Sequence, residues 1–182
     1  MKYVVYMALL LAAGCSSITK IDSGTVLIGD ALTVISDGRW NRLDGDAESD
    51  ATQVWTAEGV TLDMILFYAG NLPGFRPGML PHDIAELYAG LVAQDGGALR
   101  LERLAPAQFG GVAGFLFEHV STNRTGLVLR GLAYGAVLED RLYLMSYTAP
   151  DSHFYVKHLS AVQALAASAR IRRRETAAFA SP

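Results

Sequence analysis

Four strand-like stretches joined by short turns fill the second half of the chain, and they constrain its fold more than any other feature. They are rich in β-branched and aromatic residues, and turn-forming residues bound them. The stretches are Ala98–Leu104, Val112–Val120, Leu127–Val137 and Leu142–Thr148, separated by Gly110-Gly111, Thr122-Asn123 and Glu139-Asp140. Because consecutive strands with short connections pair antiparallel, the sequence predicts a central antiparallel sheet.

The first half of the chain predicts further strands. Gly24–Ser36 has the same β-branched density and is interrupted by Gly29-Asp30, which predicts two short strands and a turn. Thr52–Thr56 predicts another strand, in which Val54 alternates with Gln53 and Trp55. Ile18–Ile21 fits either a polar tether or an edge strand. We therefore expect a sheet of about six strands.

Three segments predict helices. Thr61 is a good N-cap and predicts a helix to about Ala69, followed by a loop to Pro81. Pro81 begins a second helix with an apolar face, and Asp95-Gly96-Gly97 ends it. Ser152–Ala169 carries an apolar stripe that must pack on the sheet. The expected fold class is α+β, with helices flanking the sheet.

The only cysteine, Cys15, follows a short apolar segment near the N-terminus. Lys2 precedes an apolar core, Tyr3–Ala13, of the length of a signal peptide, and small residues come just before the cysteine. The segment is shorter than the roughly 20 apolar residues of a membrane-spanning helix. The run Leu10–Cys15 resembles the lipobox of bacterial lipoproteins. The alternative is an inert thiol behind an ordinary secretory signal.

The lipobox resemblance implies a covalent anchor. It implies diacylglyceryl transfer to the sulfur of Cys15, cleavage between Gly14 and Cys15, and N-acylation of the new amino terminus. Two or three acyl chains would hold the protein on a bilayer, because one chain alone binds only marginally. Ser16 stands where inner-membrane lipoproteins often carry Asp, which favours the periplasmic leaflet of the outer membrane.

Composition agrees with one domain behind that anchor. We expect residues 1–14 to be removed, 15–23 to form the lipidated tether, 24–171 to form a single α+β domain and 172–182 to form a flexible basic, Ala-rich tail. The net charge of −3 supplies no broad basic field, so nucleic acid is not an expected partner. With Cys15 acylated no thiol remains for a disulfide or a thiolate metal site.

The second half of the chain also resembles PsbP-like domains. The resemblance covers roughly residues 110–171 and rests on Gly131–Ala133, Leu138–Pro150, Phe154 and Ser168–Ile171. It implies an α/β/α sandwich around a central antiparallel sheet. Members of that family bind partners or assist complexes and as a rule are not enzymes, so the resemblance disfavours catalysis without naming a function. An envelope protein is a candidate partner.

Trp40, Asn41, Arg42 and Trp55 are the candidate binding residues, because amphipathic rings and a guanidinium favour recognition surfaces. The competing and favoured interpretation places both tryptophans in the core. The basic cluster of Arg170 and Arg172–Arg174 fits either contact with anionic lipid headgroups or a cation-favouring helix C-terminus, and the second is favoured.

Two acidic patterns suggest metal sites and fail on spacing. Asp44–Asp50 alternates carboxylates as calcium loops do, but Ser49 and Trp55 occupy the positions that need Gly and Glu, so a solvated turn is favoured. His82 and Glu86 are four residues apart with Asp83 between them, yet zinc needs a further ligand. We expect neither a metal nor a cofactor.

His119 is the one residue that could serve catalysis. It shares a strand face with Phe115 and Phe117, which favours a buried structural role. No nucleophile-elbow, phosphate-binding or dinucleotide-binding motif is present in the sequence. The leading hypothesis is a non-catalytic, lipid-anchored periplasmic accessory protein. The alternative is an envelope hydrolase with a site built from loops around His119 and Tyr68.

Replacing Cys15 tests the anchor. We expect Cys15→Ala to lose lipidation and leave the membrane fraction, because the acyl chains are the expected attachment. Cell fractionation and the mass of the processed N-terminus measure this. A variant processed and sorted like the parent would contradict the lipoprotein interpretation.

Overall fold

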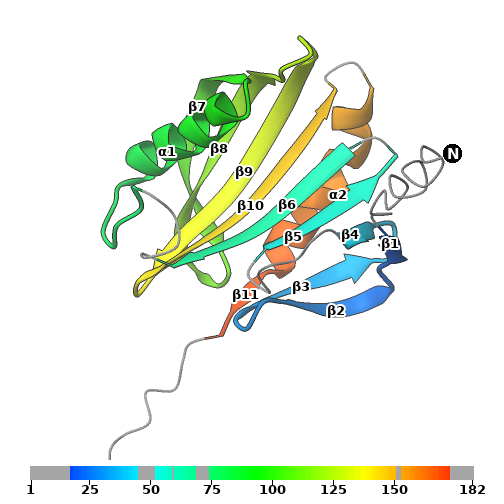
Figure 1. Ribbon diagram of the computed structural model, residues 1–182. Helices are drawn as coiled ribbons and strands as arrows, with labels where there is room; N and C mark the ends of the chain where they lie inside the picture. Colours follow the sequence, from blue (N-terminus) through cyan, green and yellow to red (C-terminus); the bar gives the residue numbers. More distant parts are fainter. Residues whose placement is uncertain (1–16, 45–51, 59, 69–73, 151–152, 173–182) are drawn as a thin grey trace, which may run out of the picture.

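A large antiparallel sheet is the middle layer of the domain (Figure 1). The computed structural model describes residues 17–44, 52–58, 60–68, 74–150 and 153–172. Within them, eight strands follow the order β1-β4-β5-β6-β10-β9-β8-β7. Their bounds are β1 Ser17–Lys20, β4 Asn41–Asp44, β5 Thr52–Ala57, β6 Val60–Tyr68, β7 Ala98–Phe109, β8 Val112–Thr122, β9 Val128–Leu138 and β10 Arg141–Pro150.

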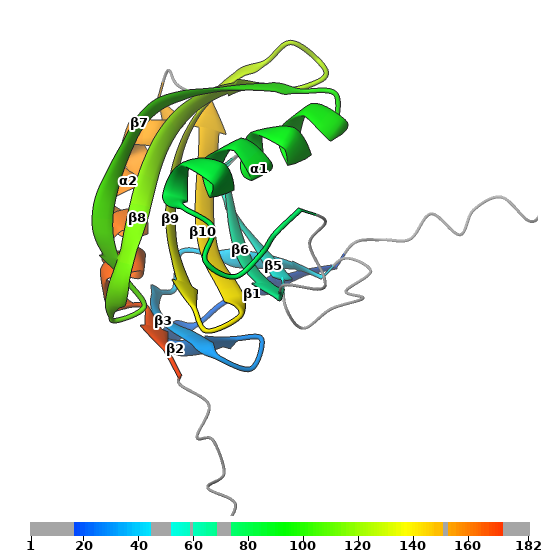
Figure 2. The ribbon, with the colours of Figure 1, turned by 90° about the vertical axis from the view of Figure 1, so that its left-hand side faces the viewer.

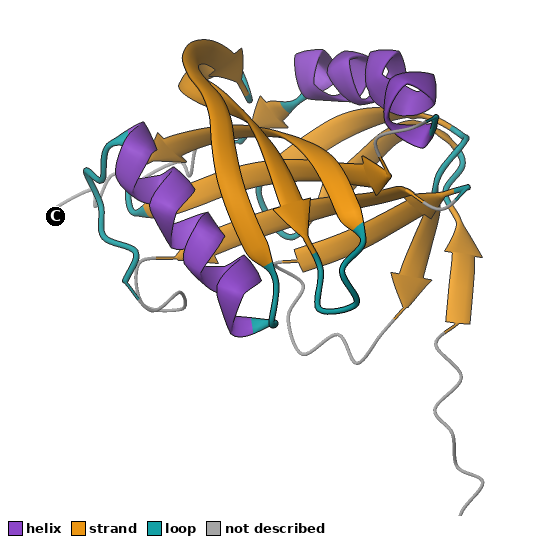
Figure 3. Cartoon of the chain, turned by 90° about the horizontal axis from the view of Figure 1, so that it is seen from above, coloured by secondary structure: helices purple, strands orange, loops and turns teal. Residues whose placement is uncertain are grey.

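Two helices lie on opposite faces of this sheet (Figures 2 and 3). Helix α1, Pro81–Gln94, crosses the face of β7 and β8, and α2, Phe154–Ser168, packs on the other face against β10. A three-stranded sheet borders α2, in the order β11-β3-β2. It consists of β2 Ser23–Ile28, β3 Leu32–Asp37 and β11 Arg170–Ile171. The described residues therefore form the expected α/β/α sandwich. None of their helices is long and apolar enough to cross a membrane.

Strand alternation divides the buried side chains between two cores. Along β10, Tyr143, Met145 and Tyr147 face α2 and the small sheet, whereas Leu142 and Leu144 face α1. All five are at most 3% exposed. Because successive side chains point to opposite faces, a strand buried on both faces must be apolar at nearly every position. This explains the nearly uninterrupted burial of β10.

The small sheet is tied to the large one by a backbone hydrogen bond and an ion pair. The Ile171 amide donates to the carbonyl of Gly110, in the β7–β8 turn, at 2.9 Å. Within the small sheet, the Arg172 amide donates to the carbonyl of Ala31 at 2.8 Å. Arg141, 3% exposed at the start of β10, reaches Asp30 in the β2–β3 turn through two hydrogen bonds of 2.7 and 3.2 Å. These contacts close the layer on the α2 side.

The largest correction concerns Val60–Tyr68, which is strand β6 and not the predicted helix beginning at Thr61. Its residues pair with β10 from Thr61↔Thr148 to Tyr68↔Arg141, and with β5 on the other side. The prediction relied on one capping signal. Hydrogen bonds to strands on both sides, which a local pattern does not show, override it.

The sheet is also larger than about six strands. Of the two interpretations of Ile18–Ile21, the edge strand is found, since β1 pairs with β4. Strand β7 continues past Leu104 to Phe109, and it accommodates Pro106 because it is the edge of the sheet. The hairpins of the second half, the strands β2, β3 and β5 and the helices α1 and α2 are confirmed.

Asp30 and Arg141 provide a test of the link between the two sheets. Asp30→Asn should lower the free energy of unfolding by about 1–3 kcal/mol, because it removes a carboxylate that forms two charge-assisted hydrogen bonds with the buried guanidinium. Asp140→Asn, at the neighbouring exposed turn, should change it by less than about 0.5 kcal/mol. Urea unfolding measures both values. Equal effects of the two substitutions would contradict the assigned role.

Candidate functional site: a pocket beside His119

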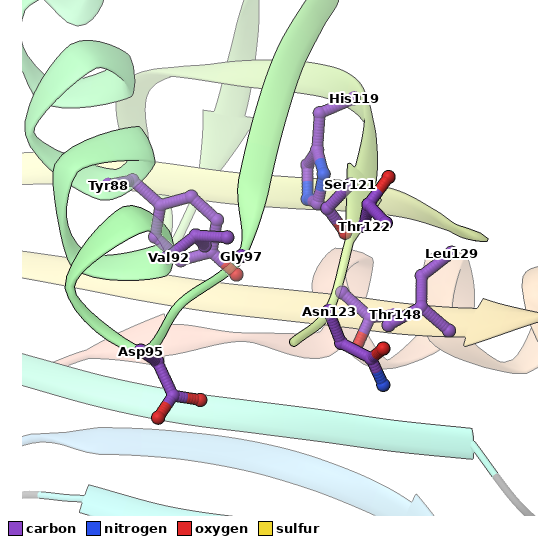
Figure 4. Close-up of a pocket in the computed structure, with 10 residues that line it drawn as sticks. All are labelled: Tyr88, Val92, Asp95, Gly97, His119, Ser121, Thr122, Asn123, Leu129 and Thr148. Carbon is purple, nitrogen blue, oxygen red and sulfur yellow. The ribbon is translucent and has the colours of Figure 1, made fainter. Parts of the chain in front are cut away.

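A pocket of about 190 Å³ opens between the C-terminal end of α1 and the α1 face of β8, β9 and β10 (Figure 4). Its apolar part comes from Val92, Leu129 and the ring of Tyr88. The remaining lining residues are Asp95, Gly97, His119, Ser121, Thr122, Asn123 and Thr148. A site of this volume is smaller than the roughly 300 Å³ of drug-sized sites, so it suits a small group.

Strand alternation places His119 in this pocket. Phe115, Phe117, His119 and Ser121 are buried on the α1 face of β8. The imidazole centroid lies 5.9 Å from the ring of Phe117 and 5.6 Å from that of Tyr88 on α1. The predicted neighbourhood of aromatic rings is therefore found, but a cavity adjoins the ring (Figure 4).

The imidazole of His119 is buried without a polar partner. The residue is 1% exposed, and neither Nδ1 nor Nε2 has a hydrogen-bond partner among the described residues. Burial lowers the pKa of His119 to about 4, so the ring is neutral at neutral pH and offers one N–H donor and one acceptor. A buried polar group without a partner costs about 1–3 kcal/mol. Such a group is expected where a partner can enter.

Gly131 makes room for this imidazole. It pairs with His119 across β8 and β9, and a Cβ at position 131 would lie 2.1 Å from both Cε1 and Nε2 of the ring. The ring therefore lies over the bare backbone of β9. Gly97 allows a second close approach, because a Cβ there would lie 2.7 Å from the carbonyl oxygen of Thr122. These two glycines bring the walls of the pocket together.

The other polar groups of the pocket are mostly hydroxyls. Tyr88 and Ser146 form a buried hydroxyl pair, with 2.6 Å between Oη and Oγ, at the edge of the site. Ser121 is 6% exposed, and Thr148 lies across from it on β10. The Asn123 side-chain oxygen already accepts the amides of Thr125 and Leu127, each at 3.0 Å. Among the described residues, the interior combines these hydroxyls with apolar walls and carries no ionised side chain.

The arrangement lacks the connections of a catalytic triad within the described residues. A general base must be in hydrogen-bond reach of its nucleophile and of an orienting acid. His119 bonds to neither Ser121 nor any carboxylate, and Asp95 is exposed at the mouth of the pocket. The strand register places His119 level with Gly131, Thr148 and Thr61. Tyr68 lies about 23 Å along β6 from that level, so no site joins it to His119.

The two tryptophans among the candidate binding residues lie in the core on the α2 side, as the favoured interpretation predicts. Trp40 and Trp55 are both 0% exposed. Trp55 donates through Nε1 to the side chain of Gln53 at 3.1 Å, and the ring of Trp40 lies 6.0 Å from that of His158. Asn41 and Arg42 are partly exposed on β4, opposite Thr56 and Trp55. Their role in binding stays a prediction.

The metal candidates do not assemble. His82 pairs with Glu86, with 3.0 Å between Nε2 and Oε1, and Asp83 accepts the amide of Leu80 at 3.2 Å at the start of α1. In the parts of the chain that the structure covers, no three His, Cys, Asp or Glu residues are placed to hold a metal ion. Most of the acidic stretch Asp44–Asp50 lies outside the described residues.

The basic cluster is described only in part. The guanidinium of Arg170 donates to the carbonyls of Ala167 and Ala169 at 3.1 and 2.6 Å, which is the favoured helix-terminal interpretation for this residue. Arg173 and Arg174 lie outside the described residues, as do Gly14 and Cys15.

No family model matches the sequence, and no curated protein matches it either. Solved structures do. Cyanobacterial PsbP from Synechocystis superposes with a TM-score of 0.61 at 13% identity, covering 88% of this chain and 96% of that one. The Ran-binding protein Mog1p of Saccharomyces cerevisiae gives 0.54 at 12% identity, covering 86% and 96%. A Bacteroides thetaiotaomicron protein gives 0.52 at 10%, covering 85% of this chain and 50% of its own. The chain therefore has the PsbP-like fold.

Sequence reasoning located His119 but missed the parts of the site that other elements supply. The sequence predicts Tyr88 only as part of the helix that begins at Pro81, and Gly131 and Ser146 only as parts of strands. The one available signal was polar character at positions where strand parity predicts burial, which Ser146 and Ser121 share with His119.

The lowered pKa of His119 predicts a loss of stability in acid. An unfolded imidazole binds a proton near pH 6.5, whereas this buried one binds it only near pH 4, so protonation favours the unfolded chain between these values. Lowering the pH from 7.5 to 4.5 should cost about 2–3 kcal/mol through this residue.

Substitution isolates this contribution from those of other groups. In His119→Phe, the loss of unfolding free energy between pH 7.5 and 4.5 should be smaller by that amount, measured by urea unfolding at both values. His82→Gln, at an exposed position, should keep the parental pH dependence. Parallel curves for His119→Phe and the parent would contradict the burial of a neutral imidazole.

Proposed function

We propose that the chain is a lipid-anchored, non-catalytic accessory protein of the bacterial cell envelope, and that it binds its ligand in the His119 pocket. One observation carries the binding part: a fully buried imidazole borders a cavity with both ring nitrogens unpaired among the described residues. A ligand group entering the pocket would supply the missing hydrogen bond. The PsbP-like fold supports the accessory role. Because proteins of one fold can differ in function, the ligand is argued from the pocket and not from the fold.

The anchor rests on the lipobox-like run that ends at Cys15. The described chain begins close to it, because strand β1 starts at Ser17 and pairs with β4. Two residues span at most about 7 Å, so an acylated Cys15 would attach the bilayer close to the sheet edge. The periplasmic leaflet of the outer membrane is the proposed location.

A hydrolase is the second candidate, and one observation favours it. His119, the Ser121 hydroxyl and the Asp95 carboxylate line the same pocket, and catalytic hydrogen bonds can tighten on substrate binding. Hydrolysis of p-nitrophenyl acetate by the purified protein, with loss of at least a hundredfold in Ser121→Ala, would favour the enzyme. An equal rate in parent and variant would leave the binding role.

In-cell photocrosslinking tests the binding role. A photoreactive amino acid at Asp95, exposed at the pocket mouth, should form a discrete adduct. The same residue at Asp140, in the turn between β9 and β10 at the far end of those strands, is the matched control and should not. Adducts read by mass spectrometry should disappear in His119→Phe and diminish in Cys15→Ala.

Two outcomes of this crosslinking experiment would overturn the proposal. Equal adducts from the Asp95 and Asp140 positions would show contact without a preferred site. The absence of an Asp95 adduct in the correctly localised protein would contradict binding at this pocket.

A further inference from the structure

We infer that the His119 pocket takes an uncharged ligand group that donates a hydrogen bond, of the amide or hydroxyl class, and places that donor against the imidazole. The inference rests on the proposed function for the location of the site, and it adds the chemistry of what enters. Three properties of the pocket carry it: its charge, its unpaired hydrogen-bonding atoms and its size.

The first property is the absence of an ionised group in the interior that the structure describes. Ser121, Thr148 and the hydroxyl pair of Tyr88 and Ser146 are neutral, and among the described residues Asp95 is the only acidic one that lines the pocket. Asp95 is exposed, and Figure 4 shows its carboxylate away from the imidazole. An ion taken from water into this interior would meet no counter-charge there, which is costly. An uncharged group avoids that cost.

The second property is the unpaired acceptor nitrogen of His119. A neutral imidazole always has one nitrogen that can only accept a hydrogen bond, and here neither nitrogen has a partner within the described part of the chain. An N–H or O–H group of the ligand would pair with it. The Ser121 hydroxyl, on the same face of β8, can donate to or accept from a second ligand atom.

The third property is a small cavity with both polar and apolar walls. At about 190 Å³ the pocket is smaller than the roughly 300 Å³ of drug-sized sites, so it suits a group of several heavy atoms. Val92, Leu129 and the Tyr88 ring offer apolar contact beside the hydroxyls. A short alkyl group bearing an amide matches both kinds of wall.

Three probes of equal size test the charge preference: acetamide is neutral, acetate is an anion and acetamidinium is a cation. Each is titrated at pH 7 into the full-length protein in detergent, and the imidazole Cε1–H signals are followed by NMR. The His119 signal, assigned by its loss in His119→Phe, should shift saturably with acetamide. Its apparent Kd should be at least tenfold lower than that for acetate or acetamidinium. The signal of exposed His82 is the internal control.

Substitutions test the geometry. Acetamide affinity should fall at least tenfold in His119→Phe, which keeps an aromatic ring but removes both nitrogens, and in Gly131→Ala, whose methyl displaces the imidazole. Gly90→Ala on α1 is the matched control, because a Cβ there meets no atom within 4 Å. Should either pocket variant fail to fold, Ser121→Ala replaces it, with an expected loss of at least threefold.

Three outcomes of the titration overturn the inference. Tightest binding of acetate makes the site an anion site, and tightest binding of acetamidinium makes it a cation site. If none of the three probes gives a saturable shift, the pocket binds no small group of this kind and is filled by water. If the Asp95 adduct persists in cells in any of these cases, only the ligand class fails. If acetamide binds and no adduct forms, the proposed function fails while the chemistry of the pocket stands.

Discussion

Burial of β10 on both faces is the constraint on which the rest of the domain depends. Its odd-numbered side chains from Tyr143 to Tyr147 require the cover of α2 and the small sheet, and Leu142 and Leu144 require α1. Neither helix could be lost without exposing one side of the same strand. Burying a large apolar side chain stabilises the fold by about 1.5–3 kcal/mol. The side chains of this one strand therefore hold the layers on both faces of the sheet in place.

The same alternation produces the site. On the α1 face, the apolar run of β10 gives way to Ser146 and Thr148, while β8 passes from Phe117 to His119 and Ser121. The change occurs where α1 ends and the chain turns through Gly96 and Gly97. Polar residues thus occur together on adjacent strands where the helical cover stops, and a pocket forms at that boundary.

The fold could be predicted where local signals and pairing agree. The hairpins from Ala98 to Thr148 have short turns between β-rich stretches, and their partners are neighbours in sequence. Val60–Tyr68 meets this condition on one side only: β5 is its neighbour in sequence, but its other partner, β10, begins more than seventy residues later. Thr61 also resembles a helix cap, so the local signal and the pairing disagree. The predicted number of strands was low for a related reason: β1 and β4 are short, and each is stabilised by pairing with the other and by the adjacent sheet.

The site was less predictable than the fold. Strand parity put His119 on a buried face, but the cavity depends on Val92, Gly97 and Thr148, which three separate elements bring together. The tryptophans illustrate the opposite problem, since residue type alone suits a recognition surface and a core equally well. Their complete burial follows from the small sheet and α2, which cover that face of β4 and β5.

With Cys15 acylated as proposed, the start of β1 at Ser17 would place the β1 edge of the sheet nearest the membrane. β1 is one edge of the sheet, and β9, which carries Gly131, is five strands away from it. At about 4.8 Å between neighbouring strands, the pocket is roughly 24 Å from that edge along the sheet. With acyl chains on Cys15, the sheet would serve as a spacer of that reach. The mouth of the His119 pocket would then meet molecules in the aqueous compartment, beyond the layer of lipid headgroups.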